Sequence, residues 1–208
     1  MTNSSHRKND PEALRAKLLD AAAGVIIEHG LPALTLERIA RQAGVSKGGL
    51  LHHYPGKDAL VDGLFEQVVT WFDGLIEAAL EPDETCHGRF SRAYLRVIAG
   101  IDMTLPEEKR LAVLILMLSS DPRYCAQWNN WVDARLDEHR QTDSTPLART
   151  LRLAADGLWL SDLGGGPDSK PEKRAEILRF LEQLDTAPAL RASGLYTGLQ
   201  TGPHSGER

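Results

Sequence analysis

The amino-acid sequence predicts an all-α fold with an N-terminal helix-turn-helix domain and a C-terminal helical bundle. Apolar residues recur at three- and four-residue spacing in one segment after another, which is the period of amphipathic helices. No Asn-Gly or Asp-Gly pair stands between alternating segments of strand character, so the sequence does not favour β-hairpins. The expected division is a flexible tail (1–9), the helix-turn-helix domain (10–56), a larger helical domain (57–185) and a disordered tail rich in Gly, Pro, Ser and Thr (186–208).

The first expected helix covers residues 11–29. Asp10 can cap it with a side-chain acceptor, and Pro11 brings a fixed φ to the first helical position. Gly30 is expected to end the helix in a left-handed conformation. The apolar stripe of this helix consists of Leu14, Leu18, Ala21, Ala22, Val25 and Ile26.

Two short helices are expected next. Thr35 can cap the second helix, and Glu37 in its first turn complements the helix dipole. Gly44 ends that helix, and Ser46 caps a third one that stops before Pro55.

The remaining helices are expected to be longer. The fourth runs from about Lys57 to Leu80, because Pro82 prevents continuation. A stretch with three glycines and a proline predicts a loop at 163–171. The later helices are expected at about 86–103, 106–118, 121–140, 146–163 and 171–185.

The second and third helices match a helix-turn-helix pattern. Two helices that cross at a steep angle need a small residue at the crossing, which is Ala40, and a positive φ in the turn, which Gly44 supplies. Ser46 leaves the start of the third helix capped but exposed, so its first residues can enter a DNA major groove. An ordinary helical hairpin with a tight turn is the alternative. The apolar residues expected beneath the turn are Ile39, Val45 and Leu50.

Charge is unevenly distributed along the chain, whose net charge is −5. Residues 1–57 contain eight Lys or Arg and five Asp or Glu, a balance of +3, so residues 58–208 carry −8. Phosphate attraction is local and screened. The basic N-terminal segment therefore favours nucleic acid as a partner in spite of the acidic sum.

The sequence predicts a cytoplasmic protein without a membrane partner. No apolar run approaches the ~20 residues that cross a bilayer, and the polar residues 1–10 lack the apolar stretch of a signal peptide. Cys86 and Cys125 have no paired Cys/His spacing around them. They are interpreted as small buried hydrophobic residues, with a thiol sensor as the alternative.

Residues 12–65 resemble the DNA-binding domain of the tetracycline-repressor (TetR) family. The resemblance rests on Ala21-Ala22, Gly30, Thr35, Ile39-Ala40, the run from Ala43 to Gly48, Leu50, Tyr54-Pro55, Lys57-Asp58 and Leu60. The later helices fit the family's second domain in number and length only. The resemblance implies an all-helical homodimer that binds an inverted-repeat operator in double-stranded DNA and releases it when a small-molecule effector binds.

The third helix departs from the family pattern at two positions. Family members commonly have a tyrosine where this chain has Leu51, and often a threonine where it has Gly49. A leucine cannot donate a hydrogen bond, but it can contact a thymine methyl group.

The expected DNA contacts lie on the third helix and beside it. Lys47 can donate to guanine or meet a phosphate, and Lys57 can hold a phosphate together with the N–H groups that open the fourth helix. For His52 and His53, packing of one against the first helix and solvation of the other is the alternative. The candidate DNA-binding residues are Thr35, Ser46, Lys47, Gly48, Gly49, Leu51, His52, His53 and Lys57.

Aromatic and soft side chains recur in the second domain, where polar anchors are few, and this favours a mainly apolar or aromatic ligand. Trp128 and Trp131 share a helical face with Arg135 and can form an aromatic wall. The alternative is ordinary core, with Trp131 and Arg135 stacked at a surface. The candidate ligand-binding residues are Phe72, Tyr94, Met117, Trp128, Trp131 and Trp159.

The last two helices are expected to form the homodimer, as a four-helix bundle across a two-fold axis. The alternative is that both pack only within the protomer. The apolar residues expected on these helices are Leu147, Leu151, Ala154, Ala155, Leu158, Trp159, Ile177, Leu178, Leu181 and Leu184.

An enzyme is not expected, because the sequence has no Ser/His/Asp order, phosphate-cradling glycine loop or metal-ligand spacing. Neither a cofactor nor a metal ion is expected. Lys47, Lys57 and the local positive charge weigh against a helical adaptor without DNA binding. The resemblance favours a repressor, and an activator stays open because that choice depends on the position of the operator.

Overall fold

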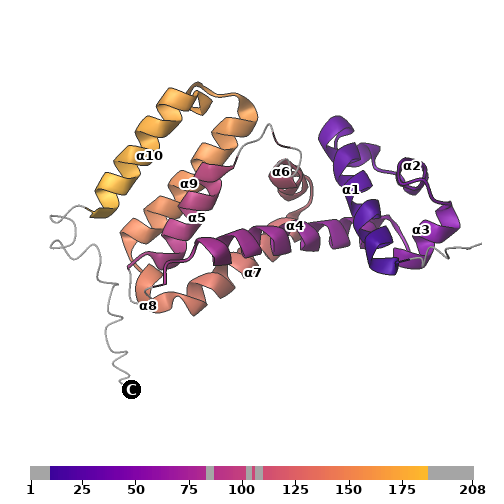
Figure 1. Ribbon diagram of the computed structural model, residues 1–208, viewed down its shortest axis with the longest axis horizontal. Coiled ribbons are helices and arrows are strands. Elements are labelled where there is room, and N and C mark those ends of the chain that lie inside the picture. The colour runs from indigo at the N-terminus through magenta and orange to yellow at the C-terminus, as the bar shows by residue number, and fades with distance from the viewer. Residues whose placement is uncertain (1–9, 83–86, 102–104, 106–109, 187–208) are drawn as a thin grey trace, which may run out of the picture. The chain divides into compact units, whose positions relative to one another are not determined.

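The computed structural model describes residues 10–82, 87–101, 105 and 110–186. Every regular element among these residues is a helix, which confirms the predicted all-α class (Figure 1). The elements are α1 (Pro11–His29), η1 (Leu31–Ala33), α2 (Leu36–Gln42), α3 (Lys47–His53), α4 (Lys57–Ala79), α5 (Arg89–Gly100), α6 (Arg110–Ser120), α7 (Pro122–Glu138), α8 (Arg140–Asp143), α9 (Pro146–Gly164), η2 (Pro167–Ser169) and α10 (Pro171–Thr186). No helix within the described ranges is both long enough and apolar enough to span a membrane.

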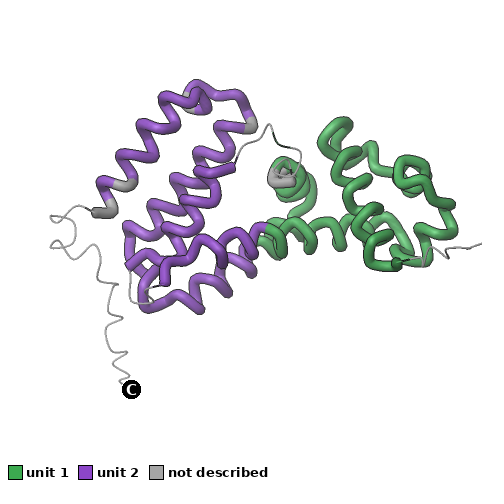
Figure 2. Tube along the Cα trace, viewed as in Figure 1, with its two compact units in different colours: residues 1–71, 104–128 green, residues 72–103, 129–208 purple. Residues whose placement is uncertain are grey.

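The chain divides into two compact units (Figure 2). Unit 1 contains residues 1–71 and 104–128, and unit 2 contains residues 72–103 and 129–208. Helix α4 therefore belongs to unit 1 over most of its length and to unit 2 at its end. The functional domain limits stay a prediction, and the expected tails lie outside the described residues except for Thr186, which ends α10.

Helix α1 provides the centre of unit 1, where it packs against α2, α3 and α6. Asp10 caps it as predicted, because Oδ1 accepts the N–H groups of Glu12 at 3.0 Å and Ala13 at 3.2 Å. Gly30 ends the helix with the positive φ that favours glycine, 77°, but its ψ of 163° lies outside the predicted left-handed helical region. The buried apolar residues of this unit include Leu18, Ala22, Ile26, Leu34, Ile39, Leu50, Leu60, Leu64, Phe65, Val68, Leu114, Met117 and Tyr124.

Helices α5 and α9 pack along each other in unit 2. Arg174 joins α10 to both of these helices. Its guanidinium donates to the carbonyl oxygens of Ile98 at 2.7 Å and Ala99 at 2.5 Å in α5, and to Asp162 Oδ2 of α9 at 3.1 Å. The buried apolar residues of this unit include Phe72, Ile76, Phe90, Ala93, Tyr94, Ile98, Leu147, Leu151, Ala155, Leu158, Trp159 and Leu181.

Two predicted helices have different limits in the structure. The helix expected at about 121–140 is present as α7, which ends at Glu138; a separate short helix, α8, follows after His139, whose φ of −97° and ψ of 22° leave the helical range. Helix α5 begins only at Arg89, since Gly88 before it has a φ of 70°. The expected helix start at 86 and the residues 102–104 and 106–109 lie outside the described residues.

The two cysteines cannot both be buried hydrophobic residues. Cys125 is exposed, and its thiol donates to the carbonyl oxygen of Leu118 at 2.9 Å. On this turn of α7 the inward position belongs to the neighbouring Tyr124, which is buried. The interpretation is therefore wrong for Cys125, and Cys86 lies outside the described residues.

The apolar face of α9 that was expected at a dimer interface is largely used inside the protomer. Leu147, Leu151, Ala155, Leu158 and Trp159 are buried, because this face belongs to the helix that packs on α5. In contrast, Leu153 and Leu160 of α9 are 64% and 62% exposed, and Phe180 of α10 is 59% exposed. Residues seven apart lie on one side of a helix, so Leu153 and Leu160 define the outer face of α9.

Candidate nucleic-acid interface

The helix-turn-helix is formed by α2, the turn after it and α3. Thr35 Oγ1 accepts the N–H of Arg38 at 3.3 Å, and Ser46 Oγ accepts the N–H of Gly49 at 3.0 Å, so both predicted caps are present. Gly44 has a φ of 67°, as the turn requires. The N–H of Val45 donates to the carbonyl oxygen of Ala40 at 2.9 Å and closes the turn. The residues buried beneath it are Ile39, Ala40, Ala43 and Leu50.

The structure gives a reason for glycine at position 49, where family members often have a threonine. A Cβ atom at this position would lie 3.3 Å from Ser46 Oγ, the atom that caps α3. A side chain here would crowd the cap. The glycine therefore leaves room for the cap, although it weakens the helix by about 1 kcal/mol relative to alanine.

Most of the predicted DNA-contacting residues are exposed, on α3 and at the starts of α2, α3 and α4. Leu51 is 37% exposed. Gly49 and His53 are half-buried, and the His53 ring lies edge-on to that of His52, with 5.4 Å between centroids. The exposed candidates are Thr35, Ser46, Lys47, Gly48, Leu51, His52 and Lys57.

Lys47 has a partner that sequence reasoning did not find. Its ammonium forms an ion pair with Glu37 in the first turn of α2. The hydrogen bond from Lys47 lowers the pKa of the Glu37 carboxyl below its usual value. Sequence reasoning assigned Glu37 to the helix dipole alone, and two opposite charges ten residues apart across a tight turn were the available signal for this contact.

Tyr54 fixes the end of α3 against α1 and α4. The side chain is buried, and the Arg15 guanidinium lies over its ring, 5.1 Å from the centroid. A Cβ atom at Gly63 of α4 would lie 2.9 Å from the Tyr54 ring, so the glycine makes room for this packing. Burial raises the pKa of the Tyr54 hydroxyl.

Tyr124 connects the start of α7 to α4 within unit 1. Its hydroxyl donates to Asp62 Oδ1 at 2.9 Å, and its ring lies 4.9 Å from that of Phe65. A hollow of about 280 Å³ beside it is lined by Leu31, Pro32, Lys57, Asp58, Val61, Ser120, Asp121, Arg123 and Tyr124. None of the predicted ligand-binding residues lines this hollow.

The predicted ligand-binding residues are divided between the two units. Met117 and Trp128 belong to unit 1, and the other four to unit 2. Of those four, Phe72, Tyr94 and Trp131 lie in one aromatic cluster: the Phe72 ring is 5.5 Å from that of Tyr94 and 5.7 Å from that of Trp131. Phe90 completes the cluster, at 6.0 Å from Tyr94 and 6.3 Å from Trp131.

The Trp131 indole and the Arg135 guanidinium share one carboxylate. Trp131 Nε1 donates to Asp73 Oδ1 at 2.9 Å, and Arg135 Nε donates to the same oxygen at 2.7 Å. Arg135 also pairs with Glu77 and Glu138. Trp131 is therefore held in one orientation by α4, with its ring edge against Phe72.

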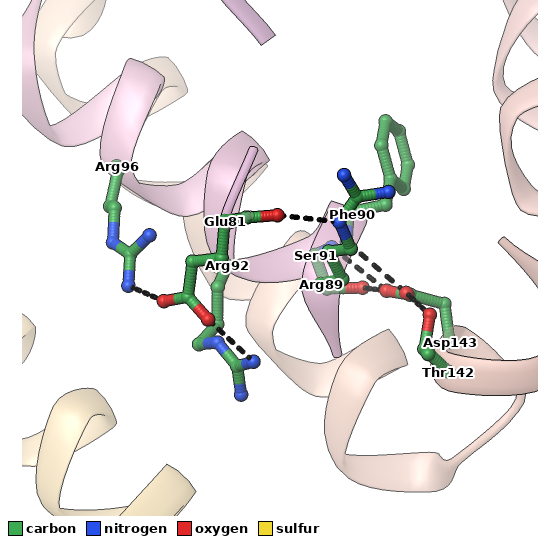
Figure 3. A network of polar contacts seen from close by, with 8 residues as sticks. All are labelled: Glu81, Arg89, Phe90, Ser91, Arg92, Arg96, Thr142 and Asp143. Atoms are coloured by element: carbon green, nitrogen blue, oxygen red, sulfur yellow. Dashed lines mark hydrogen bonds and ion pairs between the residues drawn. The ribbon is translucent and has the colours of Figure 1, made fainter. Parts of the chain in front are cut away.

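A buried polar network lies at the start of α5 in unit 2, and its groups are hydrogen-bonded to one another (Figure 3). The Asp143 carboxylate accepts the N–H groups of Phe90 at 3.1 Å and Ser91 at 2.8 Å, at the start of α5. It also accepts the hydroxyls of Ser91 at 2.5 Å and Thr142 at 2.8 Å. Arg152 of α9 donates to Ser91 Oγ at 2.8 Å.

A second polar pair lies between the same two helices. The Tyr94 hydroxyl donates to Asp156 Oδ1 at 2.6 Å. Burial raises the pKa of Asp156, and it raises that of Tyr94 well above the usual value, an effect that the nearby Asp156 carboxylate strengthens. Burial also lowers the pKa of Arg152. The interface between α5 and α9 therefore contains the charged groups of Arg152 and Asp156 as well as apolar side chains.

Unit 1 has the features of a DNA-binding regulator. Helix α3 is capped and has exposed cationic, polar and apolar side chains. The buried apolar side chains of this unit include residues of α1, α2 and α4. A helix of this kind is suited to the major groove. Comparison with known proteins identifies the family.

Residues 18–64 match the family described as "Bacterial regulatory proteins, tetR family", and residues 88–186 match "Tetracyclin repressor-like, C-terminal domain". The HTH-type transcriptional regulator BetI 2 of Chromohalobacter salexigens is 40% identical over 164 residues, which cover 70% of this chain and 75% of that protein. The HTH-type transcriptional repressor KstR2 of Mycobacterium tuberculosis is 29% identical over 157 residues, which cover 71% and 78% of the two chains.

A solved structure has a similar fold. The multidrug binding protein EbrR, crystallised with malachite green, superposes with a TM-score of 0.58 at 25% identity and covers 80% of this chain and 96% of its own. The chain belongs to the TetR family of transcriptional regulators, which confirms the predicted family and fold. Regulators of this family are not enzymes.

Proposed function

We propose that this protein is a ligand-responsive transcriptional repressor that binds an inverted-repeat operator as a homodimer and is released from it by a small, mainly apolar or aromatic molecule. The observation that carries DNA recognition is the exposed surface of α3, where Lys47, Leu51 and His52 are accessible on a helix that Ser46 caps. The name of KstR2 as a repressor supports repression over activation. Because the target is DNA, we place the protein in the cytoplasm.

The exposed side chains on and beside α3 have different proposed roles on DNA. Leu51 contacts a thymine methyl group, and Lys47 donates to the O6 and N7 atoms of a guanine. Lys57, with the N–H groups that open the 23-residue helix α4, holds a phosphate. Thr35 and His52 add polar contacts beside them, and such contacts position the helix without reading sequence when they go to phosphates.

Replacing each lysine by alanine is expected to give two different phenotypes. Lys57→Ala should weaken binding to all sequences alike and lower the salt slope by about one unit, because a phosphate contact carries no sequence information. Lys47→Ala should cost about 1–3 kcal/mol on the operator and relax the preference at one base pair per half-site. Affinities for an operator selected from random DNA, and for scrambled DNA, measured at several salt concentrations test both.

Arg140→Ala is the control, since Arg140 is an exposed, ion-paired cationic residue of α8 in unit 2, outside α9 and α10. It should leave both affinities unchanged. If Lys47→Ala loses operator and scrambled DNA in equal measure, Lys47 is another phosphate contact. Base preference would then have to come from Leu51, His52 and His53.

The homodimer is proposed to form through α9 and α10, with Leu153, Leu160 and Phe180 at its centre. These are large apolar side chains on adjacent helices of one unit, and each is more than half exposed. Symmetric pairing would bury them against their own copies. A two-fold dimer places two reading helices about 34–36 Å apart or a multiple of this, so half-sites should be spaced by whole turns.

The effector is proposed to bind in unit 2, near Phe72, Tyr94, Trp131 and Trp159. The first three are in one aromatic cluster. The indole N–H of Trp159 is buried and has no hydrogen-bond partner among the described residues, so it can donate to an acceptor on a ligand. Met117 and Trp128, which belong to unit 1, stay predictions from the sequence and are not part of this proposed site.

Malachite green, the molecule crystallised with EbrR, is the first probe for this site. It should release operator DNA and quench tryptophan fluorescence. Trp159→Phe keeps an aromatic ring but removes the buried donor, so it should weaken release by roughly two- to tenfold, as expected for one net hydrogen bond. Trp71→Phe, in unit 1, is the control. Unchanged release in both Trp131→Ala and Trp159→Phe would place the ligand elsewhere.

A further inference from the structure

We propose that Glu37 is a specificity-determining residue that holds the Lys47 ammonium away from DNA phosphates. This inference rests on the proposed function, in which Lys47 lies at the DNA surface. The two residues come from neighbouring helices, α2 and α3, on either side of the turn (Figure 1). Their side chains are 61% and 53% exposed, so the ion pair lies on the accessible side of the helix-turn-helix.

The pair changes what Lys47 can do on DNA. To reach a phosphate with its full charge, the ammonium has to leave Glu37, and the carboxylate is then left facing a polyanion. Like charges at such a surface repel over about 10 Å at 0.1 M salt. Glu37 therefore opposes any binding mode that uses Lys47 as a simple phosphate contact.

Glu37 opposes a contact between Lys47 and a base much less than a contact between Lys47 and a phosphate. A lysine ammonium has three N–H donors, and the O6 and N7 atoms of guanine are neutral acceptors. Lys47 can donate to the base edge and keep a hydrogen bond to Glu37 at the same time. The same carboxylate thus penalises non-operator DNA more than operator DNA, and it keeps the ammonium at one place on the surface of α3.

Glu37→Gln tests this directly, because the amide keeps the size of the side chain and loses the charge. Affinity for non-operator DNA should rise about three- to fivefold, the effect of an exposed ion pair of ordinary strength. Its salt slope should steepen by about one unit, because Lys47 now replaces one more counterion on phosphate. Operator affinity should change by less than twofold, so selectivity falls.

Two matched comparisons isolate the pair. Glu28→Gln removes the same charge from an exposed glutamate of α1, whose recorded partner is His29, and it should leave the salt slope as it is. In a Lys47→Ala background, Glu37→Gln should raise operator and non-operator affinity alike and leave the salt slope unchanged, because the ammonium that Glu37 restrains is gone and only the repulsion between the carboxylate and DNA is relieved. Thermal unfolding of each variant checks that α2 stays folded.

The outcomes separate this inference from the function on which it rests. If the unmodified protein binds no DNA in a selection from random sequences, the proposed function fails and the inference fails with it. If the protein binds an operator but Glu37→Gln matches Glu28→Gln, the inference alone is overturned. It is also overturned if Glu37→Gln weakens operator binding in the Lys47→Ala background, since Glu37 would then contact a base itself.

Discussion

Replacing Asp143 by alanine is expected to lower the free energy of unfolding by about 3 kcal/mol or more, the range measured when one partner of a buried charged network is removed. Asp143 is only 4% exposed, and its carboxylate accepts four hydrogen bonds. Two of these come from the first N–H groups of α5, whose own N-cap, Gly88, has no side chain. The alanine variant leaves these donors, the Ser91 hydroxyl and the Arg152 guanidinium with less negative charge nearby.

Asp143→Asn separates geometry from charge. The amide keeps one acceptor oxygen but presents an NH₂ group to a backbone N–H or a hydroxyl, so it should recover part of the lost stability. Asp137→Ala is the matched control, because Asp137 is an exposed aspartate near the end of α7 that pairs with Arg140 at the start of α8. Exposed pairs of this kind contribute about 0–1 kcal/mol.

Urea unfolding followed by circular dichroism measures all three variants. The measurements must be made at one protomer concentration, because association adds to the apparent stability of a dimer. If Asp143→Ala and Asp137→Ala unfold at the same urea concentration, the network of Figure 3 does not hold α5 in place.

Asp143 also shows where prediction from the sequence ends. The N-terminal helices were predictable because their signals are local: Asp10, Thr35 and Ser46 each cap a helix that begins at the next residue. Asp143 caps a helix that begins 54 positions earlier in the chain. No local pattern contains that information, and the periodicity of 121–140 continues through His139, where the structure interrupts the helix.

In the candidate DNA-binding site too, local features could be predicted from the sequence and contacts between helices could not. The accessible residues of α3 could be predicted, since a capped helix after a tight turn has one free side. The ion pair between Glu37 and Lys47 crosses the turn, and its geometry depends on how α2 and α3 pack. A sequence offers many opposite charges at such distances without indicating which of them meet.

Helix α9 poses a related problem, because two of its faces are apolar. Leu147, Leu151 and Leu158 repeat with helical spacing, and so do Leu153 and Leu160. Periodicity cannot decide which set packs inside the protomer. The packing of α5 decides it, and this leaves the second set exposed on the outside.

The double variant Leu153→Glu/Leu160→Glu is expected to convert the protein from a dimer to a monomer. Light scattering of the unmodified protein should give about twice the chain mass of 22.9 kDa. Two carboxylates on the outer face of α9 would meet their symmetric copies, and like charges in an apolar interface cost several kcal/mol. The variant should therefore scatter as a 22.9 kDa chain, with unchanged helical circular dichroism.

Operator binding should fall with the dimer. In a dimer, the second half-site is bound at a high effective concentration, which raises affinity by about 10²–10⁴ over a single module. The monomeric variant should thus lose at least about a hundredfold on the full inverted repeat and keep nearly unchanged affinity for an isolated half-site. This difference distinguishes lost assembly from a damaged reading helix.

Leu105→Glu is the control, since Leu105 is another exposed leucine, outside α9 and α10. It should scatter as a dimer and bind the operator normally. If Leu153→Glu/Leu160→Glu still scatters as a dimer, the interface uses another surface. If it becomes monomeric but binds the full repeat as tightly as before, each protomer recognises its half-site independently, and the two-fold operator model is wrong.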